Sequence, residues 1–245
     1  MPGRSGEAGH DAPLGDDPLV FLAVPDPAVA TLAAELAGRT DLAGAPAFAH
    51  VSGALQLTAL APLRERGYAV GAFHPLQSFP VERDPSVFRG SLVAIDASAE
   101  ELLDELSRLA EGLGARPRRV TDDQRLLYHA AAVMASNYLV ALAAQSSALL
   151  QHTGWERQEA LEALVPLMRG MVDNLERNGL PGALIGPIRR GDAATVERQV
   201  RALEPLGELP AGVYRVLGRA ALALAREAGI EEAQAVLIEA ALNDL

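Results

Sequence analysis

Short apolar runs that alternate with helical patterns constrain the fold of the first half of this chain more than any other feature. The runs cover residues 19–25, 47–52, 69–75, 91–96 and 117–120, and helical patterns lie between them over residues 28–38, 54–67 and 99–112. Alternation at this spacing is typical of βαβ units, in which parallel strands are joined by right-handed crossovers. We therefore predict an α/β domain with a parallel sheet over residues 19–121.

The second half shows no strand pattern. Its helical patterns cover residues 123–152, 155–178, 193–203, 211–228 and 231–243. Thr121, followed by two aspartates, is a typical helix start. We predict an all-helical domain over residues 122–245. Residues 1–18 are too rich in Gly, Pro and Asp to pack, and we expect them to form a flexible tail.

The charge balance limits the partners of this protein. The 245 residues include 32 acidic and 21 basic side chains, a formal net charge of −11. A nucleic-acid or anionic-membrane surface calls for a basic face, so we expect neither partner. The chain has no cysteine and only scattered histidines, which argues against a metal site. No secretory signal pattern is present, and we expect a cytoplasmic protein.

A stretch without Asp, Glu, Lys or Arg runs from Leu126 to Trp155 and is long enough to span a bilayer. It contains polar residues, among them His129, Asn137 and Gln145, which are costly inside a membrane. We therefore expect this helix to be buried inside the protein.

His50, Ser52 and Gly53 follow the second predicted strand, and His74, Gln77 and Ser78 follow the third. Ligands of doubly wound sheets bind at the carboxyl ends of the strands, so these residues are candidates for a binding crevice. Pro75 favours an extended backbone at His74, where the imidazole could act as a general acid or base. Alternatively, Ser52 caps the next helix and His74 is a buried histidine bonded to a neighbouring loop.

Two further groups of polar residues lie in the helical half. His129 and Ser136 share one face of a helix, with Asn137 beside them, which indicates either a pocket or helix packing. Arg189 and Arg190 lie in a connection rich in Gly and Pro, where guanidinium groups suit a carboxylate or a phosphate. A solvated basic pair is the alternative.

Five motifs in this order resemble a bacterial family that pairs a Rossmann-like domain with a helical domain known as domain of unknown function 2520. The motifs are AVPD (23–26), HVSGA (50–54), HPLQSFP (74–80), YHAAAVMASN (128–137) and GPIRRGD (186–192). The family is similar to 6-phosphogluconate and prephenate dehydrogenases and to pyrroline-5-carboxylate reductase. The resemblance implies oxidoreduction with NAD or NADP on a small-molecule substrate, and a homodimer formed by the helical domain.

The resemblance also implies roles for individual residues. The cofactor would lie near Val24, Pro25, Asp26, Ser52 and Gly53. The expected catalytic residues are His74, His129 and Asn137. The expected substrate-binding residues are His50, Gln77, Ser78, Ser136, Arg189 and Arg190. The chain has no lysine, so a histidine would have to supply the proton.

One departure from the family concerns the phosphates of the cofactor. Relatives begin with a strand, a GxGxxG-like loop and a helix, and no such pattern precedes Leu19. Either the true start lies upstream, or the edge of the strand at Leu19 is covered by the tail, a second subunit or another partner. Two other functions stay open: a non-catalytic homodimeric scaffold and, from the His-Pro pair at 74–75, an activity like that of prephenate dehydrogenase.

Overall fold

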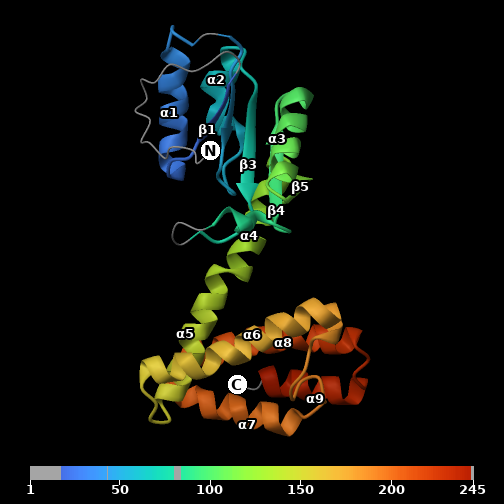
Figure 1. Ribbon diagram of the computed structural model, residues 1–245. Helices are drawn as coiled ribbons and strands as arrows, with labels where there is room; N and C mark the ends of the chain where they lie inside the picture. Colours follow the sequence, from blue (N-terminus) through green and yellow to red (C-terminus); the bar gives the residue numbers. More distant parts are fainter. Residues whose placement is uncertain (1–17, 43, 80–83, 244–245) are drawn as a thin grey trace. The chain divides into compact units, whose positions relative to one another are not determined.

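The computed structural model describes residues 18–42, 44–79 and 84–243 (Figure 1). The predicted tail, apart from Pro18, lies outside the described residues. The chain divides into two compact units that meet between Leu139 and Val140 in the sequence, whereas the sequence pattern placed the domain boundary between residues 121 and 122. The division falls later because the helix that begins at Asp122 is bonded to the first unit.

The first unit contains a five-stranded sheet in the order β1-β2-β3-β4-β5. The strands are β1 (Leu19–Leu22), β2 (Ala47–His50), β3 (Val70–Pro75), β4 (Leu92–Ala97) and β5 (Arg116–Arg119). β1, β2 and β3 are parallel, as predicted, but β4 is antiparallel to β3. The described residues between β3 and β4 form one short helix, η2 (Pro85–Phe88), and not the α-helix that usually joins parallel strands.

Helices cover both faces of this sheet. α1 (Asp26–Gly38), η1 (Leu57–Leu60) and α2 (Ala61–Glu65) contribute to the core on one face, and α3 (Glu100–Gly112) contributes to the core on the other (Figure 1). Successive strand residues alternate between the faces. In β3, for example, Val70 belongs to the core under α1 and Phe73 to the core under α3. The α/β class predicted for this part of the chain is confirmed.

The second unit is helical, which confirms the prediction for this half. Its helices are the main part of α5 (Asn137–Gln151), then α6 (Arg157–Gly182), α7 (Ala193–Leu203), η3 (Glu204–Leu206), α8 (Glu208–Glu227) and α9 (Glu232–Asn243). Val196, Leu222 and Ile238, which come from three of these helices, are buried in one apolar core. This core needs no residue of the sheet.

The single helix predicted over residues 123–152 is two helices. α4 (Asp122–Ala135) ends at Ser136, whose backbone has φ −115° and ψ −72°, and α5 begins at Asn137. The Ser136 hydroxyl donates to the carbonyl of Ala132 at 2.7 Å. A serine that bonds back to the carbonyl four residues earlier is a common cause of a helix bend.

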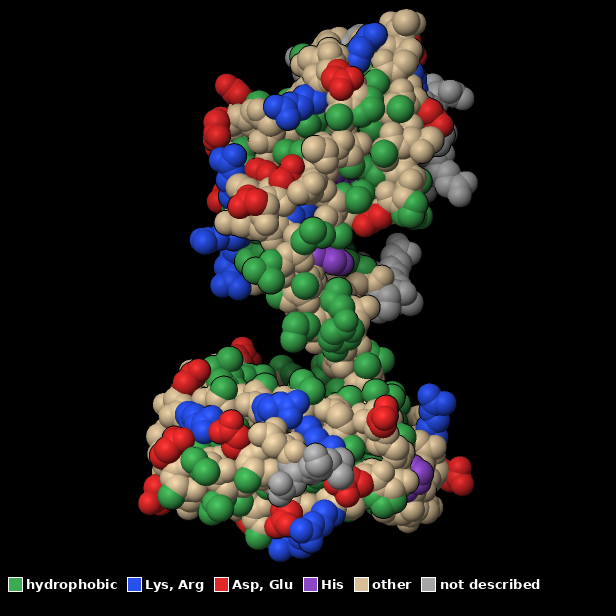
Figure 2. Space-filling view, turned by 180° about the vertical axis from the view of Figure 1, so that it is seen from behind, with side chains coloured by type: hydrophobic (Ala, Val, Ile, Leu, Met, Phe, Trp, Pro, Cys, Tyr) green, Lys and Arg blue, Asp and Glu red, His purple; other side chains and the backbone are tan. Residues whose placement is uncertain are grey.

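The segment Asp122–Gln151 is long and apolar enough to cross a membrane by length and composition. We expected it to be buried inside the protein, and that expectation is wrong for the described residues, which bury none of its most apolar window. Leu127, Met134 and Val140 are 79%, 66% and 71% exposed. Hydrophobic side chains accordingly lie at the surface along α4 and α5 (Figure 2).

Candidate functional site

Gly53, just beyond the carboxyl end of β2, lies directly against two histidine rings. A Cβ atom at this position would be 2.7 Å from Nδ1 of His129 and 2.7 Å from Cε1 of His74. His74 belongs to β3 and His129 to α4, and their ring centroids are 6.1 Å apart. Only a residue without a side chain fits there with both rings in place.

Tyr128 binds the His74 ring on its other side. Its hydroxyl oxygen is 2.8 Å from Nδ1 of His74, and the two rings meet edge to face with centroids 5.7 Å apart. The backbone of His74 is fixed in the sheet opposite Ala94. The ring of His74 is therefore held both by its strand and by a helix that lies 54 residues further along the chain.

Ser52 connects the ends of β1 and β2. Its hydroxyl donates to Oδ2 of Asp26 at 2.8 Å, and it accepts the amides of Ala54 and Leu55 at 3.1 Å each. Asp26 is the first residue of α1 and directly follows Pro25. Ser52 thus forms a local turn and does not cap the next helix, the alternative that we considered, because η1 begins after Gln56 and has no side-chain cap. Ser52 also holds the expected cofactor-binding aspartate at the same edge of the sheet.

The site contains a buried arginine that the sequence analysis missed. Arg125 is fully buried, and its Nη2 donates to the carbonyl of Val120 at 2.9 Å. Its Nε lies 3.9 Å from Oδ1 of Asp122, and Asp122 in turn accepts the amide of Leu57 at 2.9 Å. Neither Nε nor Nη1 has a hydrogen-bond partner among the described residues. A spacing of three and four residues places Arg125 on the same face of the helix as Tyr128 and His129, and this spacing could have revealed it.

His50 is also fully buried, and neither of its ring nitrogens has a hydrogen-bond partner of ordinary geometry in the described part of the chain. Burial, reinforced by the positive charge of Arg125, lowers the pKa of His50 to about 4. The same two causes, together with the neighbouring His129, lower the pKa of His74 to about 4. Both imidazoles are therefore neutral at pH 7.

Burial has the opposite effect on the tyrosine. It raises the pKa of Tyr128 to about 12, against the nearby charge of Arg125, which favours the ionised form. Burial also lowers the pKa of the Arg125 guanidinium from its ordinary value. At neutral pH the site thus combines one buried positive charge with a protonated tyrosine and the neutral imidazoles of His50 and His74.

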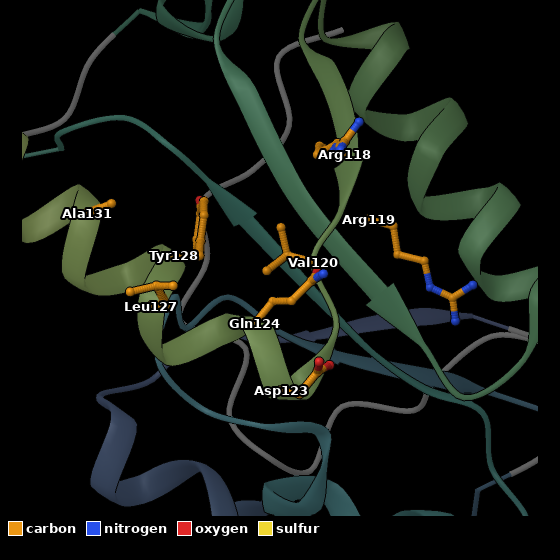
Figure 3. Close-up of a pocket in the computed structure, with 8 residues that line it drawn as sticks. All are labelled: Arg118, Arg119, Val120, Asp123, Gln124, Leu127, Tyr128 and Ala131. Carbon is orange, nitrogen blue, oxygen red and sulfur yellow. The ribbon is translucent and has the colours of Figure 1, made fainter.

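Two hollows adjoin the hydrogen-bonded pair. His74 lines a hollow of about 520 Å³ together with aromatic side chains, among them Phe21, Phe73, Phe79 and Phe88. Tyr128 lines a second, open hollow of about 700 Å³ beside β5. Arg118 and Arg119 line the second hollow from β5, and Gln124, Leu127 and Tyr128 line it from α4 (Figure 3).

The remaining residues predicted in the first unit lie apart from the histidine rings or have local partners. Gln77 lines the aromatic hollow and donates to the carbonyl of Val87 at 3.3 Å, and its side-chain oxygen accepts the amide of Ser78 at 2.8 Å. Ser136 donates to the side-chain oxygen of Asn137 at 2.9 Å, and both residues are exposed. In the described part of the chain, no hydrogen bond or ring contact joins either residue to the histidines.

Arg189 and Arg190 belong to the second unit. Nη2 of Arg189 donates to the carbonyl of Ala228, directly after α8, at 3.2 Å, and Arg190 is exposed. Asp192 accepts the amide of Thr195 at 3.0 Å and so caps α7. Local structure accounts for Arg189 and Asp192 without a ligand. Among the described residues, no group of three or more His, Asp or Glu side chains could hold a metal ion.

The fold and the strand-end site define a protein of the Rossmann-like class with an added helical domain. The sequence profile of a Rossmann-like domain matches residues 11–75. The profile of the family described as domain of unknown function 2520 matches residues 91–221, more than half of the chain. This chain therefore belongs to that family. No curated protein matches the sequence.

Solved structures show the same architecture. Protein TM1727 from Thermotoga maritima is 26% identical with a TM-score of 0.74, over 88% of this chain and 81% of that one. The putative NADP oxidoreductase BF3122 from Bacteroides fragilis is 22% identical with a TM-score of 0.64, over 83% and 74%. The 1-pyrroline-5-carboxylate reductase from Streptococcus pyogenes is 13% identical with a TM-score of 0.50, over 92% and 74%. These likenesses show that the chain shares its fold with these proteins.

Proposed function

We propose that this protein is an NAD(P)-dependent oxidoreductase in which His74 exchanges a proton with the substrate. The observation that carries the proposal is the contact of His74 and His129 with Gly53 at the carboxyl ends of β2 and β3. Ligands of such sheets bind at this edge. The fold shared with NAD(P)-dependent reductases supports the same function.

The residues present fit the nicotinamide end of a dinucleotide. Gly53 lets the imidazoles of His74 and His129 lie directly against the backbone at this edge of the sheet, and Ser52 binds Asp26 there. The sequence contains no glycine-rich phosphate loop before β1, so the proposal assigns no residue to the phosphates. When bound, a nicotinamide supplies or accepts two electrons as a hydride.

The residues of the chain have separate roles in this proposal. His74, held by Tyr128, gives a proton to a carbonyl or imine group during reduction and takes it back during oxidation. Its neutral state at pH 7 follows from its lowered pKa of about 4. His129 lies against the same glycine and orients the substrate. A lysine cannot take part, since the chain has none.

Titration with NADH and NADPH, followed by nicotinamide fluorescence and by thermal unfolding, tests this proposal. We expect at least one of the two cofactors to stabilise the protein and the variant His74→Ala to bind it. With a substrate, His74→Ala should lose turnover far more than it loses stability. His152→Ala, at an exposed position, is the control. An absence of stabilisation by millimolar cofactor would contradict the enzyme function.

A second candidate function is a homodimeric binding or scaffold protein, and exposed apolar residues of the helical unit favour it. Val140 on α5 and Leu167 and Val172 on α6 are 71%, 63% and 55% exposed. Exposed apolar surface of this kind is commonly buried against another chain. We propose that a second copy of the chain covers α5 and α6. The dimer is compatible with either function.

Light scattering of the purified protein tests the dimer. The wild type should have twice the mass of one chain, and Val172→Glu should shift it to the monomer. Glu176→Gln, one turn further along α6, is the control. A wild type that is a monomer in solution and binds to phosphatidylcholine vesicles would contradict the dimer. The apolar surface would then be a membrane-binding surface.

A further inference from the structure

The hydrogen bond between Tyr128 and His74 joins the two hollows of the first unit. Nδ1 of His74 faces the tyrosine, and His74 lines the aromatic hollow. The tyrosine lines the open hollow beside β5. A chain of two groups, each able to give and take a proton, therefore runs from a surface hollow to the carboxyl end of β3.

The other ring nitrogen of His74 faces the glycine. Nε2 would lie 2.8 Å from a Cβ at Gly53, and it forms no hydrogen bond within the described part of the chain. If Tyr128 donates to Nδ1, the single proton of the neutral imidazole must lie on Nε2. In the opposite arrangement Nδ1 donates to the tyrosine and Nε2 is unprotonated.

The ordinary acidities of the two groups favour the first arrangement. A phenol O–H donates more readily than the N–H of a neutral imidazole, and a free imidazole nitrogen accepts more readily than a phenol oxygen. Burial raises the pKa of Tyr128 to about 12 and lowers that of His74 to about 4, so both groups are neutral at pH 7. The tyrosine proton therefore points toward Nδ1, and the imidazole proton lies on Nε2, toward Gly53.

We propose that Tyr128 and His74 form a proton relay between the open hollow and the substrate, with Tyr128 as the positioning residue. This inference rests on the proposed oxidoreductase function. A reduced nicotinamide would supply a hydride to the carbonyl or imine carbon, and the π electrons of the C=O or C=N bond would move to the oxygen or nitrogen. That atom takes the proton as the Nε2–H bond breaks. The Tyr128 O–H bond breaks at the same time, its proton passes to Nδ1, and the tyrosinate takes a proton from water in the open hollow.

Nitrogen NMR of the whole protein with ¹⁵N-labelled histidine tests the relay without a substrate. Long-range ¹H–¹⁵N spectra distinguish the two neutral tautomers of a histidine. At pH 7 we expect His74 in the wild type to be a single tautomer with its proton on Nε2. Tyr128→Phe should convert it to a mixture, and Tyr138→Phe, at an exposed tyrosine, should leave it unchanged.

A proton on Nδ1 of wild-type His74, or an unchanged tautomer in Tyr128→Phe, would overturn the relay. The wild-type spectrum decides the first point even if Tyr128→Phe does not fold, and thermal unfolding of each variant checks that it does. Titration of the same samples with NADPH separates the two proposals. Cofactor binding together with the wrong tautomer would remove the relay alone, and the right tautomer without cofactor binding would remove the oxidoreductase.

Discussion

The strand-end histidines of the first unit and the arginine pair of the helical unit are both polar groups beside glycine and proline, yet their surroundings differ. Arg189 bonds the carbonyl that follows α8, and Arg190 is solvated. His50 and Arg125 are buried with nitrogens that lack partners among the described residues. Buried polar groups are normally hydrogen-bonded, and exceptions require an explanation. The difference separates polar residues that build local structure from those available for chemistry.

The largest effect that we expect from this difference concerns pH. The pKa of His50 is lowered to about 4 from 6.5, so the folded protein binds fewer protons than the unfolded chain between these values. The contribution of neutral His50 to the free energy of unfolding is fully present above pH 6.5 and is lost as the pH falls to 4. A shift of this size corresponds to about 3 kcal/mol.

Hydrogen exchange of the β2 and β3 amides at pH 7 and pH 4.5 measures this loss in the first unit. His50→Asn should lose clearly less stability on acidification than the wild type, and His152→Asn, in the helical unit, should lose as much as the wild type. Equal losses in all three proteins would show that His50 is not the titrating group. The buried histidine would then not differ from solvated polar groups in its effect on stability.

A methyl group at Gly53 is the next test. In Gly53→Ala the new Cβ meets both imidazoles below 3 Å, and one ring must move, at a cost of about 2 kcal/mol. Gly170→Ala, at an α6 position with open space, should instead be neutral or stabilise the helix by up to ~1 kcal/mol. Thermal unfolding and the NMR shifts of His74 and His129 report both changes. Unmoved histidine signals in Gly53→Ala would show that the rings do not depend on this glycine.

The smallest effects should come from the arginine pair. Arg189→Ala removes the bond to the carbonyl of Ala228 and should cost about 1 kcal/mol of stability. Arg190→Ala, at an exposed side chain, should change stability by less than about 0.5 kcal/mol. NADPH affinity, read by fluorescence, should be unchanged in both. A large loss of affinity in either variant would assign the pair a ligand-binding role and erase the contrast with the histidines.

The sequence was informative wherever local pattern decides the structure. The strand pattern around Phe48 and Phe73 predicted the α/β part, and the helical pattern after Thr121 predicted the helical part. Both patterns are visible in the sequence because apolar residues recur at the spacing that places them on the buried side of a strand or a helix. The antiparallel direction of β4 was not predictable in this way, since apolar runs do not encode strand direction. The break at Ser136 depends on one hydroxyl that bonds to its own helix.

The candidate site was predictable only in part. The rule that ligands bind at strand ends identified His50, Ser52 and His74 as candidates. Arg125 was missed because a charged residue near a helix start is normally solvated, and only the folded chain shows that it is buried. The pairing of Tyr128 with His74 joins residues 54 positions apart, which no local pattern reveals.

The hydrogen bonds that assemble the site have a consequence for the order of folding. They join residues 26, 54 and 65 positions apart: Ser52 with Asp26, His74 with Tyr128, and Leu57 with Asp122. Closing long loops costs entropy that must be recovered from contacts formed earlier. We therefore expect the sheet to form first and α4 to dock last, so that during synthesis His74 and Gly53 stay open to solvent until residues beyond Tyr128 are available.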